Sequence, residues 1–243
     1  MHFIGLFYPW GLILQAIAVV HFFRRRPQAY WFWVIIFLGG LGALIYIGVE
    51  VIPDLGLLRG AMQRMSHRRK IRGLEALVLE NPAVGNREEL ADLCLEDRRY
   101  ARARELYDQV ISKRTDTLDP FYRRGLAALA LSDAPAAVAD FERVVRQDPK
   151  YDFNRAIGLF AHALALAGQT DRADAVFKQA TEVSTLSETC YNYASFLAGQ
   201  KRTAEAREWA ERILARRLTI PLYLRRRERP WFQKTKALLK KLK

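Results

Sequence analysis

Cysteine is scarce in this chain of 243 residues, which contains only Cys94 and Cys190. Two cysteines this far apart form neither a CxxC pair nor a zinc-ligand spacing. Both fall within apolar, helix-like patterns, where a free cysteine packs as a small buried hydrophobe. We therefore expect both cysteines to be buried packing residues, and they give little information about the redox compartment.

Recognisable catalytic motifs are missing as well. The sequence has no glycine-rich phosphate loop, no G-x-S-x-G and no histidine pair at metal-ligand spacing. The carboxylates of the middle of the chain are spaced as expected for the solvent-exposed faces of helices. We therefore expect no enzymatic activity, no cofactor and no metal site.

Acidic side chains are rare at both ends of the chain, although the net charge is +13. Basic residues predominate in 1–72 and in 212–243, whereas acidic residues outnumber basic ones in 73–211. A mildly acidic middle between two basic flanks is not the pattern of a uniformly basic nucleic-acid binder. We therefore expect no nucleic-acid partner.

The N-terminal third contains long apolar runs. Residues 3–23 and 29–49 carry no charge, and each run has 21 residues. As helices they would span about 31 Å, close to a hydrocarbon core of about 30 Å. Between them lie Arg24, Arg25 and Arg26, which favour a membrane interface because an arginine at the bilayer centre costs about 2.5–3.5 kcal/mol. The pattern predicts a transmembrane helical hairpin in residues 1–54, with spans at about 3–23 and 29–50. The alternatives are a buried hairpin, a re-entrant hairpin or a cleaved signal peptide.

The stretch "RRRPQAYWFWVIIFLGGLGALIYIGVE" resembles the paired-helix N-terminal segment of bacterial cardiolipin synthases and other phospholipase D-type proteins. Gly42 and Tyr46 match its central glycine and tyrosine, while Gly39 replaces the usual proline and Glu50 the usual glycine. Phospholipase chemistry is not implied, because no histidine begins an H-x-K-x4-D motif. The resemblance implies an anchor and a multi-pass location in the bacterial inner membrane. Six basic residues follow the second run and three lie in the turn, which favours a cytoplasmic position for the following domain.

The middle of the chain repeats with a period of 33–36 residues. The recurring positions are Ala103, Tyr107 and Val110, then Ala137, Phe141 and Val144, then Ala173, Phe177 and Ala180, and more weakly Ala206, Ala210 and Ile213. This A-x3-aromatic-x2-small pattern resembles the tetratricopeptide repeat (TPR). The resemblance implies two antiparallel helices per unit, in which the alanine permits close approach and the aromatic ring fills the groove toward the next unit.

The first helix of each unit would contribute further core positions. These are Leu90, Ala91 and Cys94, then Gly125 and Ala128, then Phe160, Ala161 and Leu164, and finally Tyr193, Ala194 and Leu197. We predict that Ala137 cannot accept a bulky ring, whereas Asp133, expected in a turn, should be replaceable at little cost.

The predicted fold is all-α, with the transmembrane hairpin followed by a TPR-type α-solenoid. Residues 55–80 would form a basic connecting helix, and about four repeats would occupy 81–218. Residues 219–243 would form a basic C-terminal helix that either caps the solenoid or binds lipid.

The TPR resemblance implies a scaffold that binds a protein or peptide through the concave face of the solenoid. By position, that face would include Glu88, Asp92, Asp119, Tyr122, Arg155, His162, Glu188 and Tyr191. The alternative is a lipid-associated accessory protein of envelope or phospholipid synthesis. Its anionic lipid headgroups would be held by Arg24, Arg25, Arg26, Arg68, Arg69 and Lys70.

Overall fold

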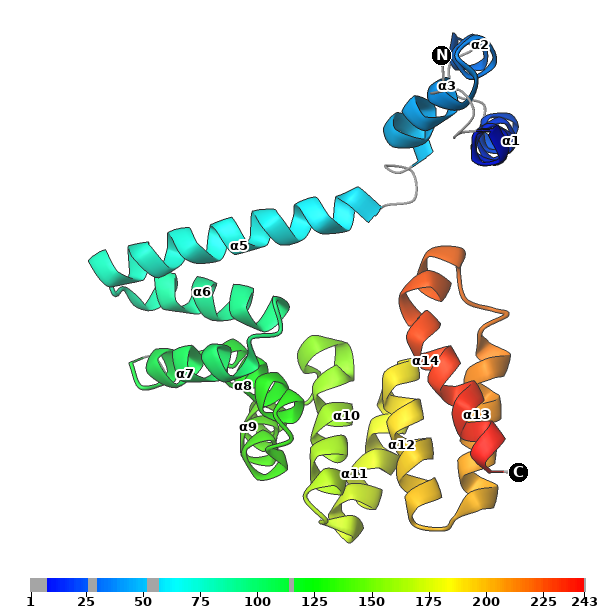
Figure 1. The fold of residues 1–243 in the computed structure, drawn as a ribbon. Coiled ribbons are helices and arrows are strands. Elements are labelled where there is room, and N and C mark those ends of the chain that lie inside the picture. Colours follow the sequence, from blue (N-terminus) through cyan, green and yellow to red (C-terminus); the bar gives the residue numbers. More distant parts are fainter. Residues whose placement is uncertain (1–7, 26–29, 52–56, 114–115, 243) are drawn as a thin grey trace. The chain divides into compact units, whose positions relative to one another are not determined.

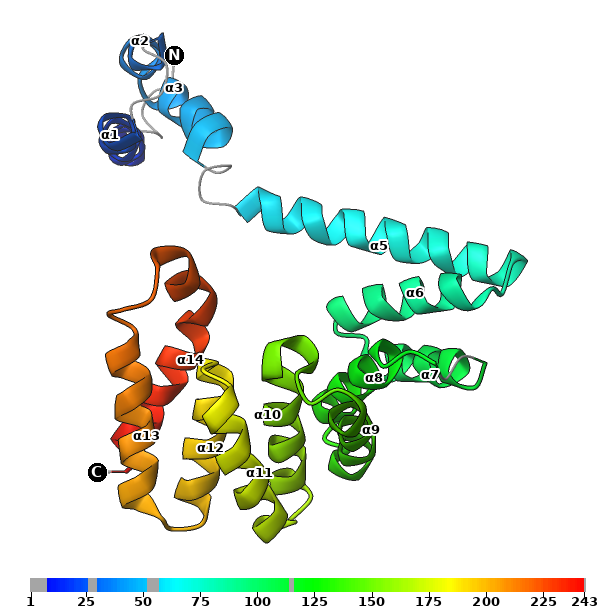
Figure 2. The same ribbon diagram turned by 180° about the vertical axis from the view of Figure 1, so that it is seen from behind.

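The computed structural model describes residues 8–25, 30–51, 57–113 and 116–242. The chain divides into two compact units, one up to Arg72 and one from Gly73 onward. In the part of the chain described, every regular element is a helix (Figures 1 and 2). Helix α5 (Leu57–Glu80) begins in the first unit and ends in the second.

The first unit contains α1 (Tyr8–Arg25), α2 (Tyr30–Phe37), α3 (Gly39–Tyr46) and a short π-helix, η2 (Ile47–Val51). Its small apolar core consists of Ala18, Trp31, Ile35, Ala43 and Tyr46. Three polar contacts cross this core, and one joins Nδ1 of His21 to the hydroxyl of Tyr46 at 2.9 Å. The amide of Gln15 donates to the carbonyl oxygen of Ile35 at 3.0 Å, and the indole of Trp31 donates to Glu50 at 3.0 Å.

Glycines determine how the second apolar run folds. Gly39 has a φ of +55°, in the left-handed region, and it begins α3 directly after the break that ends α2. A Cβ on Gly40 would lie 3.1 Å from the Cα of Gly11, so α1 and α3 approach closely there. The small residues of the second run therefore allow these two helices to approach closely.

The prediction of a multi-pass protein of the inner membrane is wrong. The second run is broken at Gly39 into two helices of 8 residues, each only about 12 Å long at 1.5 Å per residue. Helix α1 has 18 residues, and the last two are Arg24 and Arg25. Across the described ranges, no helix combines the length and the apolar character needed to cross a membrane. Uncharged length alone was misleading, because it does not reveal where the backbone interrupts a helix.

The second unit is built from four helix pairs and a final helix. The pairs are α6 (Val84–Glu96) with α7 (Tyr100–Ile111), α8 (Asp119–Ala130) with α9 (Ala134–Gln147), α10 (Tyr151–Leu166) with α11 (Thr170–Val183), and α12 (Ser187–Gly199) with α13 (Thr203–Arg216). Within each pair the chain reverses at a residue with positive φ, and these residues are Arg98, Ser132, Gly168 and Lys201. Figures 1 and 2 show α10, α12 and α14 as successive neighbours.

The repeat pattern of the sequence forms the core of this unit. All twelve of its alanine, aromatic and small apolar positions, from Ala103 to Ile213, are buried. The expected core positions of the first helices, including Cys94, are buried too. At Gly125 an added Cβ would lie 3.0 Å from the ring of Phe141, which shows how closely α8 and α9 pack. The predicted register of the helix pairs is therefore confirmed.

Helix α14 (Leu222–Lys241) closes the row of pairs. Phe232 is buried with Ile213 and Ile220, and Leu242 packs against the main core. The guanidinium of Arg207 on α13 donates to the carbonyl oxygen of Leu242 at 2.6 Å. Helix α14 therefore packs against the last pair, and whether it serves as a cap or binds lipid stays a prediction.

Candidate protein-binding face

The first helices of neighbouring pairs are linked by side-chain bonds. On α8, Arg123 contacts Asp92 of α6 at 3.3 Å and Asp119 of its own helix at 2.5 Å. The hydroxyl of Tyr107 donates to Asp92 at 2.6 Å, and that of Tyr151 on α10 donates to Asp119 at 2.8 Å. These bonds connect α6, α8 and α10.

A second group of bonds continues from α8 to α12. The hydroxyl of Tyr122 donates to Asp152 at 2.5 Å, and the guanidinium of Arg155 lies 3.3 Å from the Tyr122 oxygen. Arg155 also donates to both carboxylate oxygens of Glu188, at 2.6 and 3.3 Å. The rings of Tyr122 and Tyr151 lie 5.0 Å apart and join the two groups. We call the surface that carries Asp92, Asp119, Tyr122, Arg155 and Glu188 the first-helix face.

The ionisation of this face is fixed by its own contacts. Burial, followed by the hydrogen bond to Asp152, raises the pKa of Tyr122, so this hydroxyl stays a donor. Burial alone would lower the pKa of Arg155, but the bond to Glu188 outweighs it and the pKa is raised. Burial raises the pKa of Asp92 despite the opposing effects of Tyr107 and Arg123. Forked arginine–carboxylate pairs of this kind also fix the geometry of the side chains.

At the other end of the face, α12 meets α14. The hydroxyl of Ser187 donates to Glu228 at 2.5 Å. The ammonium of Lys234 lies 4.2 Å from the centre of the Trp231 ring and 5.8 Å from that of Tyr191. These contacts are close enough for cation–π attraction.

The structure brings together most of the residues predicted to form the concave face. Arg123 links Asp92 to Asp119, and Arg155 links Tyr122 to Glu188. The remaining three are Glu88, partly buried on α6, His162, partly buried on α10, and Tyr191, packed against Trp231. Burial lowers the pKa of His162, although Glu188 opposes this. Binding of a partner by these eight residues stays a prediction.

Several residues of the face were missed by the sequence reasoning. They are Arg123, Tyr151, Asp152, Glu228, Trp231 and Lys234. The repeat period offered a signal for one of them. The bonds from Arg155 to Tyr122 and to Glu188 each join residues 33 positions apart, and Asp152 follows Asp119 by one such repeat.

The start of α10 has an unusual backbone. Asp152, Phe153 and Asn154 have φ values of 48°, 52° and 63°, all in the left-handed region. A left-handed non-glycine residue costs about 1–2 kcal/mol, and aspartate and asparagine tolerate it better than phenylalanine does. The turn persists because its neighbours hold it. The hydroxyl of Tyr122 donates to Asp152, and the hydroxyl of Tyr151 donates to Asp119. The side-chain amide of Asn154 donates to the carbonyl oxygen of Val183 at 3.3 Å.

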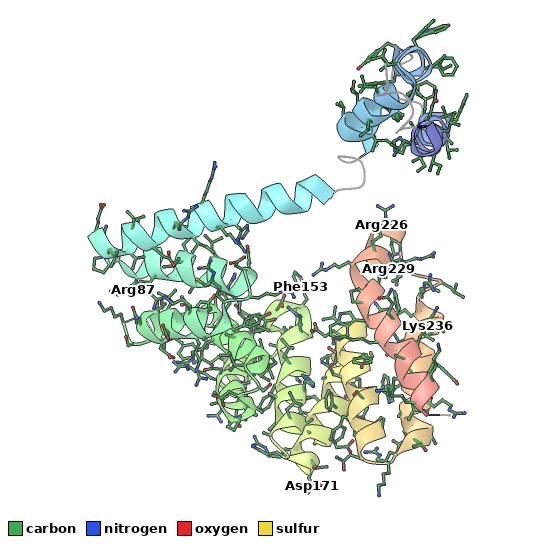
Figure 3. The ribbon with its side chains drawn as sticks, viewed as in Figure 1. Arg87, Phe153, Asp171, Arg226, Arg229 and Lys236 are labelled. Carbon is green, nitrogen blue, oxygen red and sulfur yellow. The ribbon has the colours of Figure 1, made fainter. Side chains whose placement is uncertain are left out.

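This left-handed turn presents one large apolar side chain. Phe153 is 90% exposed, whereas its neighbours Tyr151, Asp152 and Asn154 are partly buried. Figure 3 shows Phe153 standing out at the start of α10. Backbone strain of this kind is frequent at functional sites.

The described residues hold no group of three or more His, Cys, Asp or Glu side chains that could bind a metal ion. Of the predicted lipid contacts, Arg68, Arg69 and Lys70 are exposed on α5, while the side chains of Arg24, Arg25 and Arg26 lie outside the described residues. Binding of lipid headgroups stays a prediction. The carboxylates of the first-helix face each accept bonds from arginine or tyrosine, which holds the face in one arrangement.

Comparison with known proteins identifies the fold. YrrB, "a TPR protein with an unusual peptide-binding site", has a TM-score of 0.54 at 17% identity, over 68% of this chain and 86% of its own. TTC0263, a thermophilic TPR protein of Thermus thermophilus, has a TM-score of 0.51 at 21% identity, over 74% and 96%. The fold is a TPR-type α-solenoid.

A third match is MamA from Desulfovibrio magneticus RS-1, with a TM-score of 0.57 at 17% identity, over 68% of this chain and 93% of its own. No protein-family model matches the chain, and no curated protein matches it. At identities this low the likeness to solved structures establishes the TPR fold and leaves the ligand open. The part of the prediction that concerns helical repeats is therefore confirmed. No similarity supports an anchor like that of cardiolipin synthases.

Proposed function

We propose that this chain is a protein-interaction scaffold that binds a peptide or helix of a partner along the first-helix face. The TPR repeats at 81–218 would provide the face, the helix at 55–80 would lead into them, and the helix at 219–243 would close them. The observation that carries the proposal is Phe153, which is 90% exposed on a left-handed turn anchored from α8 and α11. A ring presented from an anchored turn is an accessible apolar anchor for a partner side chain.

The surroundings of Phe153 fit a peptide site. Aromatic and arginine side chains dominate the binding energy of protein interfaces, and Phe153 lies two residues from Arg155. The Arg155–Glu188 pair is already formed, so a partner would not have to order it. YrrB, which shares the fold, is described as having a peptide-binding site, and this description is consistent with the proposal.

The proposal can be tested with displayed random peptides selected on the full-length chain. Enriched peptides should carry an apolar residue, and their affinity should fall about tenfold or more in Phe153→Ser, because a central aromatic anchor contributes at least about 2 kcal/mol. The matched control is Leu166→Ser, which removes an exposed apolar side chain at the other end of α10. Its affinity should stay unchanged. Enrichment of no peptide, or equal binding by the two variants, would refute the proposal.

A further inference from the structure

A cluster of positive charge lies beside the junction of α13 and α14, and its residues are not among those that form the first-helix face. It surrounds a cavity of about 390 Å³. Five cationic side chains line this cavity, namely Arg217, Arg225, Arg226, Arg229 and Lys236. Phe232 and Gln233 complete the lining. We call it the C-terminal basic pocket, and Figure 3 shows Arg226, Arg229 and Lys236 following one another along α14.

The pocket has a fixed wall. Arg225 donates through Nε to the carbonyl oxygen of Ile220 at 2.9 Å and through Nη2 to that of Leu218 at 2.8 Å. These bonds hold the α13–α14 loop against the start of α14. Phe232 is buried in an apolar cluster with Ile213 and Ile220, which fixes the helix that carries the other cations.

The cations of the pocket lack counter-charges among the residues described. No ion pair or hydrogen bond to a described residue is made by the side chains of Arg217, Arg226, Arg229 or Lys236, and no carboxylate lines the cavity. The one acidic residue of α14, Glu228, accepts a bond from Ser187. Elsewhere in this unit arginines are commonly paired, as Arg123, Arg155 and Arg202 are.

Such a cluster of exposed cations favours binding of an anion from outside. Arginine does not lose its proton in proteins, so mutual repulsion cannot be relieved by titration. Guanidinium groups match phosphate oxygens in forked pairs. A phosphate group brings about −1.5 to −2 charges and three acceptor oxygens, whereas a carboxylate brings one charge and two oxygens. A cavity of 390 Å³ also falls within the roughly 300–1,000 Å³ of small-molecule sites.

We propose that the C-terminal basic pocket binds a diphosphate group, either free or as part of a small molecule. Arg226, Arg229 and Lys236 surround the phosphate oxygens. Arg225 contributes its charge from a fixed position and keeps the loop in place. The pocket is separate from Phe153, so occupation of one does not require the other.

The probe is inorganic pyrophosphate, titrated calorimetrically into the full-length chain without divalent cations. We expect one site per chain, with affinity that falls as salt is added. The double variant Arg226→Gln/Arg229→Gln should bind at least about tenfold more weakly, since each variant side chain loses a charge-assisted hydrogen bond. The matched control is Lys113→Gln/Lys150→Gln, which removes two exposed charges elsewhere in the second unit and should bind as the parent does.

Three results would overturn the proposal. One is the absence of pyrophosphate binding, and another is equal binding by the two double variants. The third is citrate binding as tightly as pyrophosphate, which would indicate a site for carboxylates. If the first result is found and the chain floats with phosphatidylcholine vesicles containing phosphatidic acid, the cluster binds a lipid surface instead. Should Arg226→Gln/Arg229→Gln unfold, Lys236→Gln serves in its place, with the same expected loss.

Discussion

Replacing Gly158 by alanine tests how closely the first helices must pack. A Cβ on Gly158 of α10 would overlap the Oγ1 atom of Thr189 on α12 and lie 2.8 Å from its Cγ2 atom. Thr189 is only 1% exposed, so its side chain cannot swing into solvent. The same approach of α10 and α12 places Arg155 within 2.6 Å of Glu188. The close packing of α10 and α12 that forms this part of the first-helix face therefore depends on the absence of a Cβ at Gly158.

The expected effect follows from two opposing contributions. Overpacking in a well-packed core costs about 1–3 kcal/mol, while alanine gains about 1 kcal/mol over glycine inside a helix. We expect Gly158→Ala to lose up to about 2 kcal/mol of unfolding free energy. In a chain of this size that lowers the melting temperature by about 4–8 °C, measured by circular dichroism at 222 nm. Gly199→Ala, where nothing lies within 4 Å of an added Cβ, should leave the melting temperature unchanged or raise it.

A second substitution makes this test specific. Thr189→Ala removes the two atoms that the new Cβ meets first, so the double variant Gly158→Ala/Thr189→Ala should be more stable than the sum of its single changes implies. Equal shifts in Gly158→Ala and Gly199→Ala, or strict additivity with Thr189→Ala, would refute the close approach of α10 and α12.

Three further predictions concern single positions. Asp133→Ala should lower the unfolding free energy by about 1 kcal/mol in chemical denaturation, because Asp133 caps α9 through the amide of Ala136 and pairs with Arg104 at 2.7 Å; a neutral result would contradict the cap. Gly168→Ala should lower the unfolding free energy by about 1 kcal/mol in the same measurement, because Gly168 has a φ of +74°. An unchanged unfolding free energy would show that the turn does not need glycine. Burial lowers the pKa of His162 below its ordinary value, so the unfolded chain takes up the proton first and stability falls as the pH drops through about 6.5. His162→Gln should reduce the loss of melting temperature between about pH 7.5 and 5.5, and an unchanged pH profile would contradict the assignment.

The helical repeats could be read from the sequence because local pattern and packing agree. Ala103 and Tyr107 recur one repeat later as Ala137 and Phe141, and all four side chains are buried. The sequence located the turn at Asp133 correctly, but it did not reveal that the Asp133 side chain stabilises α9. Its carboxylate caps α9, so the expectation of a neutral replacement by alanine is replaced by the cost predicted above.

The apolar N-terminal third was misread because hydropathy does not report backbone continuity. Residues 29–49 are uncharged throughout, yet the helix stops at Phe37 and resumes at Gly39. Gly39, which begins the second of these helices, adopts a φ of +55° at this break. Composition alone gave no reason to place the interruption there.

The candidate site was only partly predictable. The repeat period brings Tyr122, Arg155 and Glu188 to equivalent positions on successive helices, so their meeting could be expected. The left-handed turn that exposes Phe153 could not, since phenylalanine has no preference for that conformation. It depends on contacts with residues about one repeat away, such as the bond from Tyr122 to Asp152.

Site-specific photo-crosslinking at position 153 tests the proposed binding face most directly. A photoreactive phenylalanine analogue would replace Phe153 in the full-length chain, and Leu166 in the control. A selected peptide would then be added and the adducts mapped by mass spectrometry. We expect one discrete adduct at position 153, centred on an apolar residue of the peptide, and none at position 166. The absence of an adduct at 153, or the same adducts at both positions, would contradict the claim that Phe153 is the anchor of the first-helix face.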